Sequence, residues 1–592
     1  MTAHLLALEI GPVAPFIAAA RKTRDLWFGS WMLSEIAKAA ALAVARAGGG
    51  HTCLIFPAPT DGKLLEADSR VDFTVADELL AELPAGVPPE KVALAAKEAV
   101  HERWLEFSRK TRADIKSFFL RDDTWNDQTN PEVKPDFTTL VLECYAAWVP
   151  LTHYASDRHR LKRLLAGRTH CRNFPPVAKP FPDVPKSSLD GTRETVLAKP
   201  RDDSARDHQA ARLRLTRGEQ LDAPGVVKRT WGGTQSYPSV SRIAADPWLR
   251  GAAAQEPVLF GTFCEECERL RRADILGRVD PTRHLAYAGF PFEGVAVYPT
   301  RYQELLEESG QEPAVLAPLA ARLRGLTAKL GEPQAYYALL VADGDRVGAA
   351  IEKQTTPEAH RKFSQELERF AETARKIISR AKPEGQKLPH FGAAVFVGGD
   401  DVLAFLPVDT VVRCADELRQ SFAKVWDGIT LSVGIAIGHY LDALEDVYAK
   451  ARETMYRAKE PRNALAITYQ PRGGSPITVC RGWETGIASD IDLWADRLAS
   501  GRLPDKVAYD LRELASVYTP ERWPNAETLG HALRADVTRL LSAKQGTARD
   551  DFAPLVARIQ SAADLIDLAN TVLIARRVER AMSQAPADGG LG

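Results

Sequence analysis

Three aspartates in the second half of the chain have the residue type and spacing of a metal-dependent catalytic site. Asp343 comes directly after an apolar run, and Asp400 and Asp401 complete the sequence Gly398-Gly399-Asp400-Asp401. Carboxylate oxygens, together with substrate phosphates, are the ligands that Mg²⁺ prefers. Two such ions roughly 3.5–4 Å apart can activate a 3′-hydroxyl and stabilise a leaving pyrophosphate. The three aspartates therefore predict a two-metal site for nucleotidyl transfer.

Glycines accompany these aspartates. Gly398 and Gly399 allow backbone conformations that a side chain forbids, and with Gly344 they are candidates for close contact with a triphosphate. Gly and Asp are also the usual residues of a polar hairpin turn, so the turn alone fits that simpler interpretation equally well. The position of Asp343 at the end of a strand favours the metal site. Asp345 either supports the site from behind or begins the next helix, and we expect the latter.

The elements that must position these residues are clearest over residues 335–470. Apolar runs predict four strands, and amphipathic patterns predict a helix after Thr356-Pro357 and another from Val412 to Phe422. The strands are expected over residues 336–341, 393–397, 402–406 and 429–437. The order β-α-β-β-α-β is the ferredoxin-like arrangement, whose first strand lies beside the hairpin. The carboxylates can therefore converge although 57 positions (400 − 343) separate them.

The remaining segments show weaker patterns. A buried strand over residues 5–10, a helix and a second strand over 52–56 open the chain, and 57–140 suggests mostly helix and loop. Residues 165–330 are irregular and rich in proline and charge, as in a connecting domain with some helix. The last hundred or so residues, from about 483, have helical periodicity.

Bulk properties limit the class of protein. A chain of 592 residues is too long for one hydrophobic core. A formal net charge of −1 gives no global argument for nucleic-acid binding, so such a surface must be local. Seven scattered cysteines suit a reducing cytosol. Glu9 and Pro12 interrupt the apolar start, so no signal peptide is expected, and no apolar stretch is long enough to span a bilayer. We expect a cytoplasmic protein without membrane contact.

Two residues downstream are further candidates. Lys459 lies near the end of a predicted helix, where its ammonium could reach a β- or γ-phosphate or could simply be solvated. Ser432 could hydrogen-bond a ribose or base, although a serine that packs within the strand is slightly more plausible.

These residues resemble the GGDEF diguanylate cyclases in layout, but the Gly-Gly-Asp-Asp turn is similar to that of the large polymerase/cyclase-type subunit of type III CRISPR complexes, in the Cmr branch (type III-B). The resemblance extends to the N-terminus and the middle segment and runs to about residue 475. It is carried by Ile10 to Val13, Ala20 to Trp27, Gly29-Ser30, Lys186 to Gly191 with Arg193-Glu194, Gly218 to Leu221, Lys228-Arg229 and Tyr337 to Gly348.

The resemblance implies an α+β protein with two ferredoxin-like palm domains. These are a first palm without an acidic metal site (1–165), a middle connecting domain (166–330), a second palm with the GGDD turn (331–475) and a C-terminal helical domain (476–592). It implies partner subunits, guide RNA and target RNA, and conversion of ATP into cyclic oligoadenylates when target RNA binds. Mg²⁺ or Mn²⁺ would be held by Asp343, Asp400 and Asp401. Lys459 would contact phosphate, Ser432 the nucleotide, and Ser30 would help to frame the pocket.

Two departures from the family pattern carry expectations of their own. Many members begin with a histidine-aspartate nuclease domain, but no His-Asp dipeptide occurs here, so we expect no DNase activity from this sequence. The family's paired zinc cysteines are reduced to Cys171. Cys264 and Cys267 have the right spacing for half a zinc site and would need His170 and Cys171 to complete it, whereas such a pair is more often incidental.

Two other functions remain open from the sequence. A free-standing dinucleotide cyclase acting on GTP would not need the long N-terminal domain and middle motifs. A catalytically silent scaffold of a ribonucleoprotein would have no use for three converging carboxylates, which repel one another unless a cation lies between them.

Overall fold

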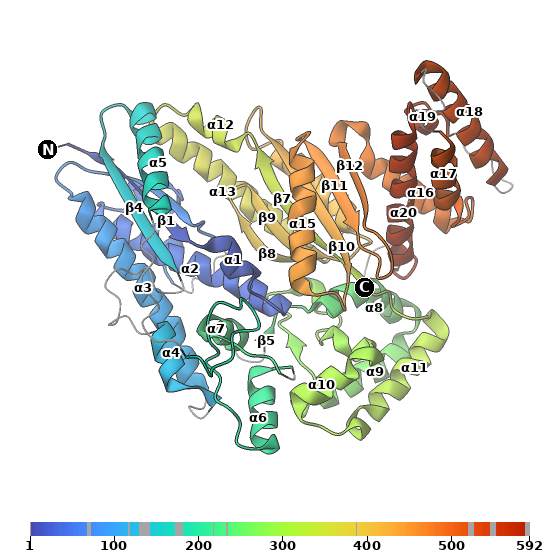
Figure 1. Ribbon diagram of the computed structural model, residues 1–592, viewed down its shortest axis with the longest axis horizontal. Helices are drawn as coiled ribbons and strands as arrows, with labels where there is room; N and C mark the ends of the chain where they lie inside the picture. The colour runs from blue at the N-terminus through green and yellow to red at the C-terminus, as the bar shows by residue number, and fades with distance from the viewer. Residues whose placement is uncertain are drawn as a thin grey trace.

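The structure, a computed structural model, describes residues 2–67, 73–115, 119–129, 142–171, 181–216, 218–231, 235–385, 387–518, 526–544 and 552–586. The fold is α+β, as expected, with a four-stranded antiparallel sheet and a six-stranded mixed sheet in one half of the molecule and a largely helical half beneath them (Figure 1). No helix in these ranges is long and apolar enough to cross a membrane.

The first sheet has the strand order β2-β3-β1-β4. Its strands are β1 (His4–Gly11), β2 (Leu54–Phe56), β3 (Glu78–Leu83) and β4 (Glu143–Pro150). Both faces are covered: Leu6 and Leu8 pack in one core with α2 (Thr23–Ala47) and α3 (Pro89–Asp114), whereas Leu5 packs in another with α5 (Tyr154–His170). Burial on both faces explains the uninterrupted apolar run of β1. The expected second strand begins later, because His51–Cys53 forms a 3₁₀ turn, and β3 and β4 were not predicted.

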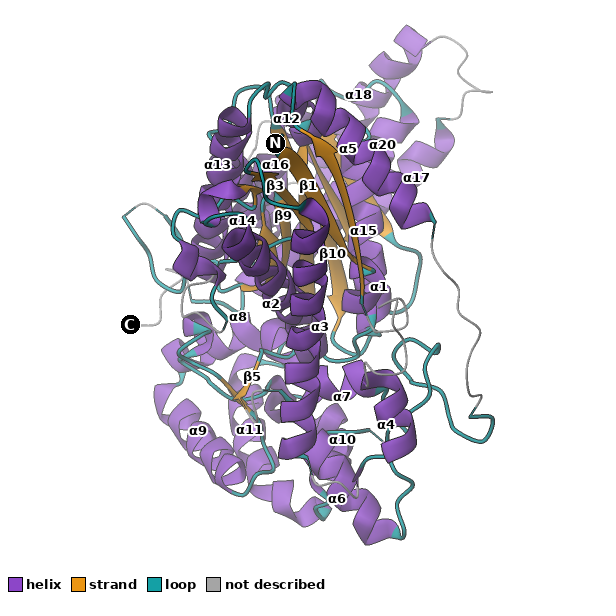
Figure 2. Ribbon diagram, turned by 90° about the vertical axis from the view of Figure 1, so that its left-hand side faces the viewer, coloured by secondary structure: helices purple, strands orange, loops and turns teal. Residues whose placement is uncertain are grey.

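The second sheet has the order β12-β11-β10-β7-β9-β8. Its strands are β7 (Tyr336–Asp345), β8 (Ala393–Gly398), β9 (Asp401–Leu406), β10 (Thr430–His439), β11 (Ala464–Tyr469) and β12 (Ile477–Gly482). The order β10-β7-β9-β8 confirms the predicted ferredoxin-like arrangement. One face packs against α13 (Pro357–Ser379) and α14 (Val411–Phe422), and α15 (Leu444–Lys459) packs on β10 and β11 on the other. Figure 2 shows the strands enclosed by helices.

Helices also make up most of the middle segment, which the sequence suggested would be irregular. They are α6 (Asp203–Leu213), α7 (Ala223–Thr230), α8 (Val240–Gln255), α9 (Pro257–Arg272), α10 (Tyr302–Ser309) and α11 (Ala317–Leu330). The predicted C-terminal helices are α16 (Ile487–Ala499), α17 (Val507–Val517), α18 (Ala526–Lys544), α19 (Ala553–Val556) and α20 (Ala562–Met582). Because α5 ends at His170 and β12 at Gly482, we propose domain boundaries near residues 171, 331 and 482.

A buried ion cluster joins the first sheet domain to the middle segment. Arg229 of α7 donates to both carboxylate oxygens of Asp25 on α2, at 2.7 Å each, and to Glu219 at 3.0 Å. All three side chains are at most 1% exposed. Burial alone would raise the pKa of Asp25, but the Arg229 guanidinium holds it below its usual range. The neighbouring Lys228 donates to the Phe16 and Ala19 carbonyls. The N-terminal and middle segments therefore share one polar core.

Replacing Arg229 by alanine should destabilise the chain by about 3–5 kcal/mol, because two buried carboxylates lose the guanidinium that they share. The shift in urea unfolding midpoint, followed by tryptophan fluorescence, measures this. Arg206→Ala is the matched control, because its ion pair with Asp203 is exposed and should contribute under about 1 kcal/mol. Equal midpoints for the two variants would contradict a structural role for the cluster.

Candidate active site

The Gly-Gly-Asp-Asp sequence forms the predicted hairpin turn between β8 and β9. Gly398 pairs with Asp401, which leaves Gly399 and Asp400 as a two-residue loop. Gly399 has a φ of 61°, a left-handed conformation that favours glycine. Since β9 pairs directly with β7, the turn lies beside the end of the strand that carries Asp343.

Gly344 allows the turn to approach β7 closely. A Cβ atom at this position would lie 2.7 Å from Oδ2 of Asp400 and 2.6 Å from the Val347 side chain. Any larger residue would push the carboxylate of Asp400 away from the strand. The glycine that separates Asp343 from Asp345 therefore sets the position of a carboxylate 56 residues later (400 − 344).

The three aspartates influence one another electrostatically. Burial, followed by the charge of Asp343, raises the pKa of Asp400 to about 6. Asp401 is solvent-exposed. The surrounding protein atoms nevertheless desolvate its carboxylate, and together with the charges of Asp400 and Asp343 they raise its pKa as well. Such carboxylates gain from any cation placed between them.

The positive charge beside these aspartates is the ammonium group of Lys459. Its ammonium, at the end of α15, donates to the Asp343 carboxylate and, at 2.8 Å, to the Gly344 carbonyl, and lies 3.3 Å from Asp345. Its side chain is 22% exposed, so a ligand can still reach it. Lys459 thus lies beside the aspartates, where its ammonium contacts the carboxylate of Asp343.

Asp345 does not begin the next helix, so that expectation was wrong. It is the last residue of β7, is 1% exposed, and α12 (Val347–Glu352) starts two residues later. Its carboxylate accepts hydrogen bonds from the Ser432 hydroxyl (2.8 and 2.9 Å), the Thr430 hydroxyl (2.9 Å) and the Asn463 amide (2.8 Å). Asp345 therefore ties together the elements that carry the site.

Ser432 and Ser30 do not lie in the positions expected for residues that contact a nucleotide. Ser432 is completely buried and directs its hydroxyl to Asp345. Ser30 is 3% exposed within α2 and makes no hydrogen bond to the turn among the described residues. Ser34, one turn further along α2, instead accepts from the amide of Val75, in the segment next to the Gly-Gly-Asp-Asp turn.

The first domain contributes a carboxylate that sequence reasoning missed. Thr74 lies close enough to Gly398 for a Cβ there to meet its methyl group at 3.3 Å. The nearby Asp77 adds to the rise in the pKa of Asp401, and burial raises its own pKa. Asp77 precedes β3, the strand that was not predicted, so no motif marked it. Recognising β3 would have placed Asp77 directly before the start of a strand.

The donor set suits a hard divalent cation. Asp343, Asp400 and Asp401 offer only carboxylate oxygens, and their mutual repulsion leaves room for a charge of the opposite sign. Within the described ranges no group of three or more histidine, cysteine, aspartate or glutamate side chains is gathered closely enough to hold a metal ion.

The same result applies to the candidate zinc cysteines. Cys267 is fully buried on α9, and burial raises its pKa and, to about 11, that of Cys264. Cys171 follows α5, which lies against the first sheet at the opposite side of the molecule from α9 (Figure 1). The structure therefore does not bring Cys171 and His170 to the cysteine pair. Cys267 packs instead as a small apolar side chain of the core.

Comparisons with known proteins agree with this architecture. The model of the family described as Cas10/Cmr2, second palm domain, matches residues 336–466, and that of CRISPR-associated protein Cmr2, N-terminal, matches residues 5–119. A curated relative, CRISPR system Cmr subunit Cmr2 of Pyrococcus furiosus, is 23% identical over 570 residues. The match covers 81% of this chain and 63% of the relative, so the chain spans less than two thirds of that protein's length.

Two solved structures share the fold. One is titled Type III-B Cmr-beta in the apo state (TM-score 0.66, 14% identity, covering 98% of this chain and 82% of that one). The other is titled Type III-B Cmr-beta bound to cognate target RNA (TM-score 0.68, 14% identity, covering 98% and 83%). The two family models thus cover the candidate site and the first sheet, so that these two segments are similar to the second palm domain of Cas10/Cmr2 and to the N-terminal part of Cmr2, and the solved structures share the fold.

Proposed function

We propose that this chain is the nucleotidyl-transferring subunit of an RNA-guided type III-B complex and converts ATP into cyclic oligoadenylates when target RNA binds. The observation that carries the proposal is the packing of the Gly-Gly-Asp-Asp turn on Gly344, which sets Asp400 and Asp401 beside the end of β7 that carries Asp343. The similarity of residues 336–466 to the second palm domain of Cas10/Cmr2 supports it. Two relatives, a Cmr subunit and a Cmr complex bound to target RNA, support the proposed partners, which are the other effector subunits, guide RNA and target RNA.

In this proposal the three aspartates hold Mg²⁺ or Mn²⁺. Such ions lower the barrier by neutralising charge on the phosphates and on the attacking oxygen. The chemical step forms a bond between a 3′-hydroxyl oxygen and the α-phosphorus of ATP and breaks the bond to the β-phosphate, so pyrophosphate leaves. The chain positions the reactants: Gly398 and Gly399 let the triphosphate approach the backbone, and Lys459 can exchange Asp343 for a phosphate oxygen.

Asp345, Ser432 and Asp77 have supporting roles. Asp345 and Ser432 fix the end of β7 against β10, so that Asp343 keeps its orientation. Asp77 brings the first palm to the edge of the turn, which supports an ATP site framed by both palms.

Replacing Asp400 and Asp401 together by alanine should abolish synthesis, a loss of at least about 10³-fold. The complex is assembled with guide and matching target RNA, given labelled ATP or GTP with Mg²⁺ or Mn²⁺, and its products are identified by mass spectrometry. Co-purification of the subunits is the control and should not change. Absence of product from the unmodified complex favours a silent scaffold, a product from GTP alone favours a dinucleotide cyclase, and full activity of the variant refutes the assignment of these aspartates.

Asp345→Asn should reduce synthesis without removing a metal ligand. In the asparagine side chain an NH₂ group replaces one of the two oxygens that together accept hydrogen bonds from Ser432, Thr430 and the backbone amide of Asn463. Buried groups left unpaired cost about 1–3 kcal/mol each. We expect kcat to fall roughly tenfold, whereas the dependence of the rate on Mn²⁺ concentration should not change. Titration of Mn²⁺ at saturating ATP measures both. A large shift in that dependence would make Asp345 a direct ligand.

A further inference from the structure

A second cavity lies away from the Gly-Gly-Asp-Asp turn. It has a volume of about 1120 Å³ and is lined by the start of α2, by the middle segment including α10, and by the turn between β10 and α15. Tyr440 and Leu444 line it, whereas Asp343, Asp400 and Asp401 do not. Ser432 and Tyr440 stand at opposite ends of β10, roughly 26 Å apart at 3.3 Å per residue. The cavity is therefore separate from the candidate active site.

One wall of this cavity contains a buried arginine without an acidic partner. Arg24 is 6% exposed and donates one hydrogen bond, from Nη2 to the Trp231 carbonyl. No carboxylate among the described residues forms an ion pair with it. A guanidinium has five N–H donors, so most of those of Arg24 have no acceptor in the described part of the chain. Burial and the charge of Arg214 lower the pKa of Arg24 to about 10, although Asp25 and Glu293 oppose the effect.

Two more arginines face the same space. Arg21 is exposed, and its side chain makes no hydrogen bond or ion pair among the described residues. Arg214 lines the cavity beside Glu293, since both come within about 3 Å of a Cβ built on Gly277 (3.0 and 2.9 Å). Arg24 and Arg21 therefore face the cavity without an ion-pair partner among the described residues.

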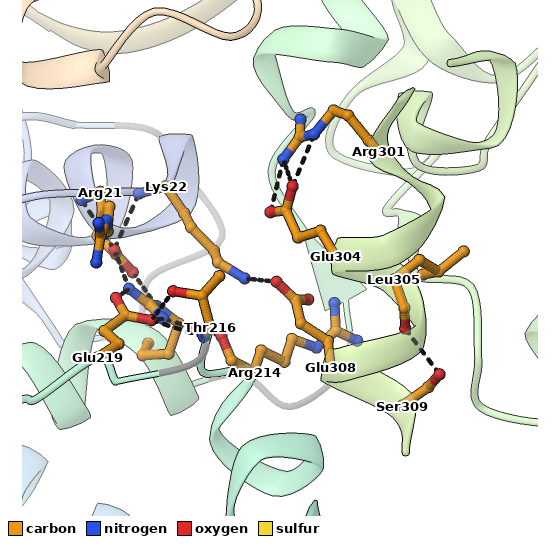
Figure 3. Close-up of polar contacts among 12 residues, drawn as sticks. Arg21, Lys22, Arg214, Thr216, Glu219, Arg301, Glu304, Leu305, Glu308 and Ser309 are labelled. Carbon is orange, nitrogen blue, oxygen red and sulfur yellow. Dashed lines mark hydrogen bonds and ion pairs between the residues drawn. The ribbon is translucent and has the colours of Figure 1, made fainter. Parts of the chain in front are cut away.

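Two acidic side chains of the opposite wall, Glu308 and Glu304, are already paired. Figure 3 shows Lys22 reaching across from the start of α2 to Glu308 of α10, at 2.5 Å. Arg301, which directly precedes α10, makes three hydrogen bonds of 2.6–2.8 Å with Glu304 on that helix. These pairs leave little negative charge on the α10 side to satisfy Arg21 and Arg24. The unsatisfied donors face a space that a ligand can enter.

We propose that this cavity binds a phosphate-bearing ligand of nucleotide size through Arg21, Arg24 and Arg214. Guanidinium groups bind phosphate oxygens in bidentate pairs, and such charge-assisted bonds are the strong ones in a partly buried site. The volume is slightly above the usual range for ligand cavities, about 300–1,000 Å³, and therefore leaves room for a nucleotide. The phosphate can belong to a free nucleoside triphosphate or to the end of an RNA strand. In either case the ligand would touch three parts of the chain at once.

Binding of labelled ATP and of an octanucleotide RNA, with and without a 5′-phosphate, tests the proposal. The full-length chain is assayed in EDTA, which suppresses metal-dependent binding at the aspartates, and inorganic pyrophosphate serves as competitor. We expect ATP or the 5′-phosphorylated RNA to bind, and Arg21→Gln with Arg24→Gln to weaken binding at least about tenfold. Arg46→Gln is the matched control, since Arg46 is exposed near the other end of α2.

Each outcome has a stated meaning. Preference for ATP identifies a free nucleotide, and dependence on the 5′-phosphate identifies an RNA end. Should Arg24→Gln fail to fold, Arg21→Gln with Arg214→Gln carries the test, because neither side chain is fully buried. Failure of both probes to bind, or equal affinity of the unmodified and substituted chains, would overturn the proposal. The result does not depend on nucleotide synthesis, which the Asp400 and Asp401 variants test separately.

Discussion

A single buried carboxylate, that of Asp345, holds the candidate active site together. An ionised group in the interior is costly unless hydrogen bonds and an opposite charge compensate it. Asp345 has both, because Ser432, Thr430 and the Asn463 amide donate to it and Lys459 lies 3.3 Å away. These groups belong to β10, to the turn before β11 and to the end of α15. The carboxylate therefore fixes several elements around the strand that presents Asp343.

The charge balance of the site follows from the same arrangement. Asp343, Asp345, Asp400 and Asp401 stand against one lysine, and the raised pKa of Asp400 reflects the excess of negative charge. Lys459 stabilises the site without a metal ion and can turn to an anionic substrate when one arrives. This gives one side chain two compatible positions, against a carboxylate and against a phosphate.

The second sheet and its hairpin could be predicted because local signals agree there. Apolar runs mark β7 and β10, and glycines mark the turn. By contrast, β3 and β4 contain charged or exposed residues in the sequences of Glu78–Leu83 and Glu143–Pro150, so their strands become clear only when β1 pairs with both. The role of Asp345 could not be predicted either, since its partners lie 85 to 118 residues away. The helices of the middle segment were obscured by its many prolines and charges.

The ion cluster of Asp25, Arg229 and Glu219 also bears on how the chain is made. Asp25 and Arg229 are 204 positions apart, and ribosomes add about 5–20 residues per second. Roughly 10–40 s pass between the synthesis of α2 and that of its buried partner, calculated from the same rates. During that interval the nascent N-terminal domain contains Asp25 without Arg229, and α2 without the helix α7 that packs against it. Completion of this domain must therefore wait for the middle of the polypeptide to leave the ribosome, and a chaperone would act usefully in that interval.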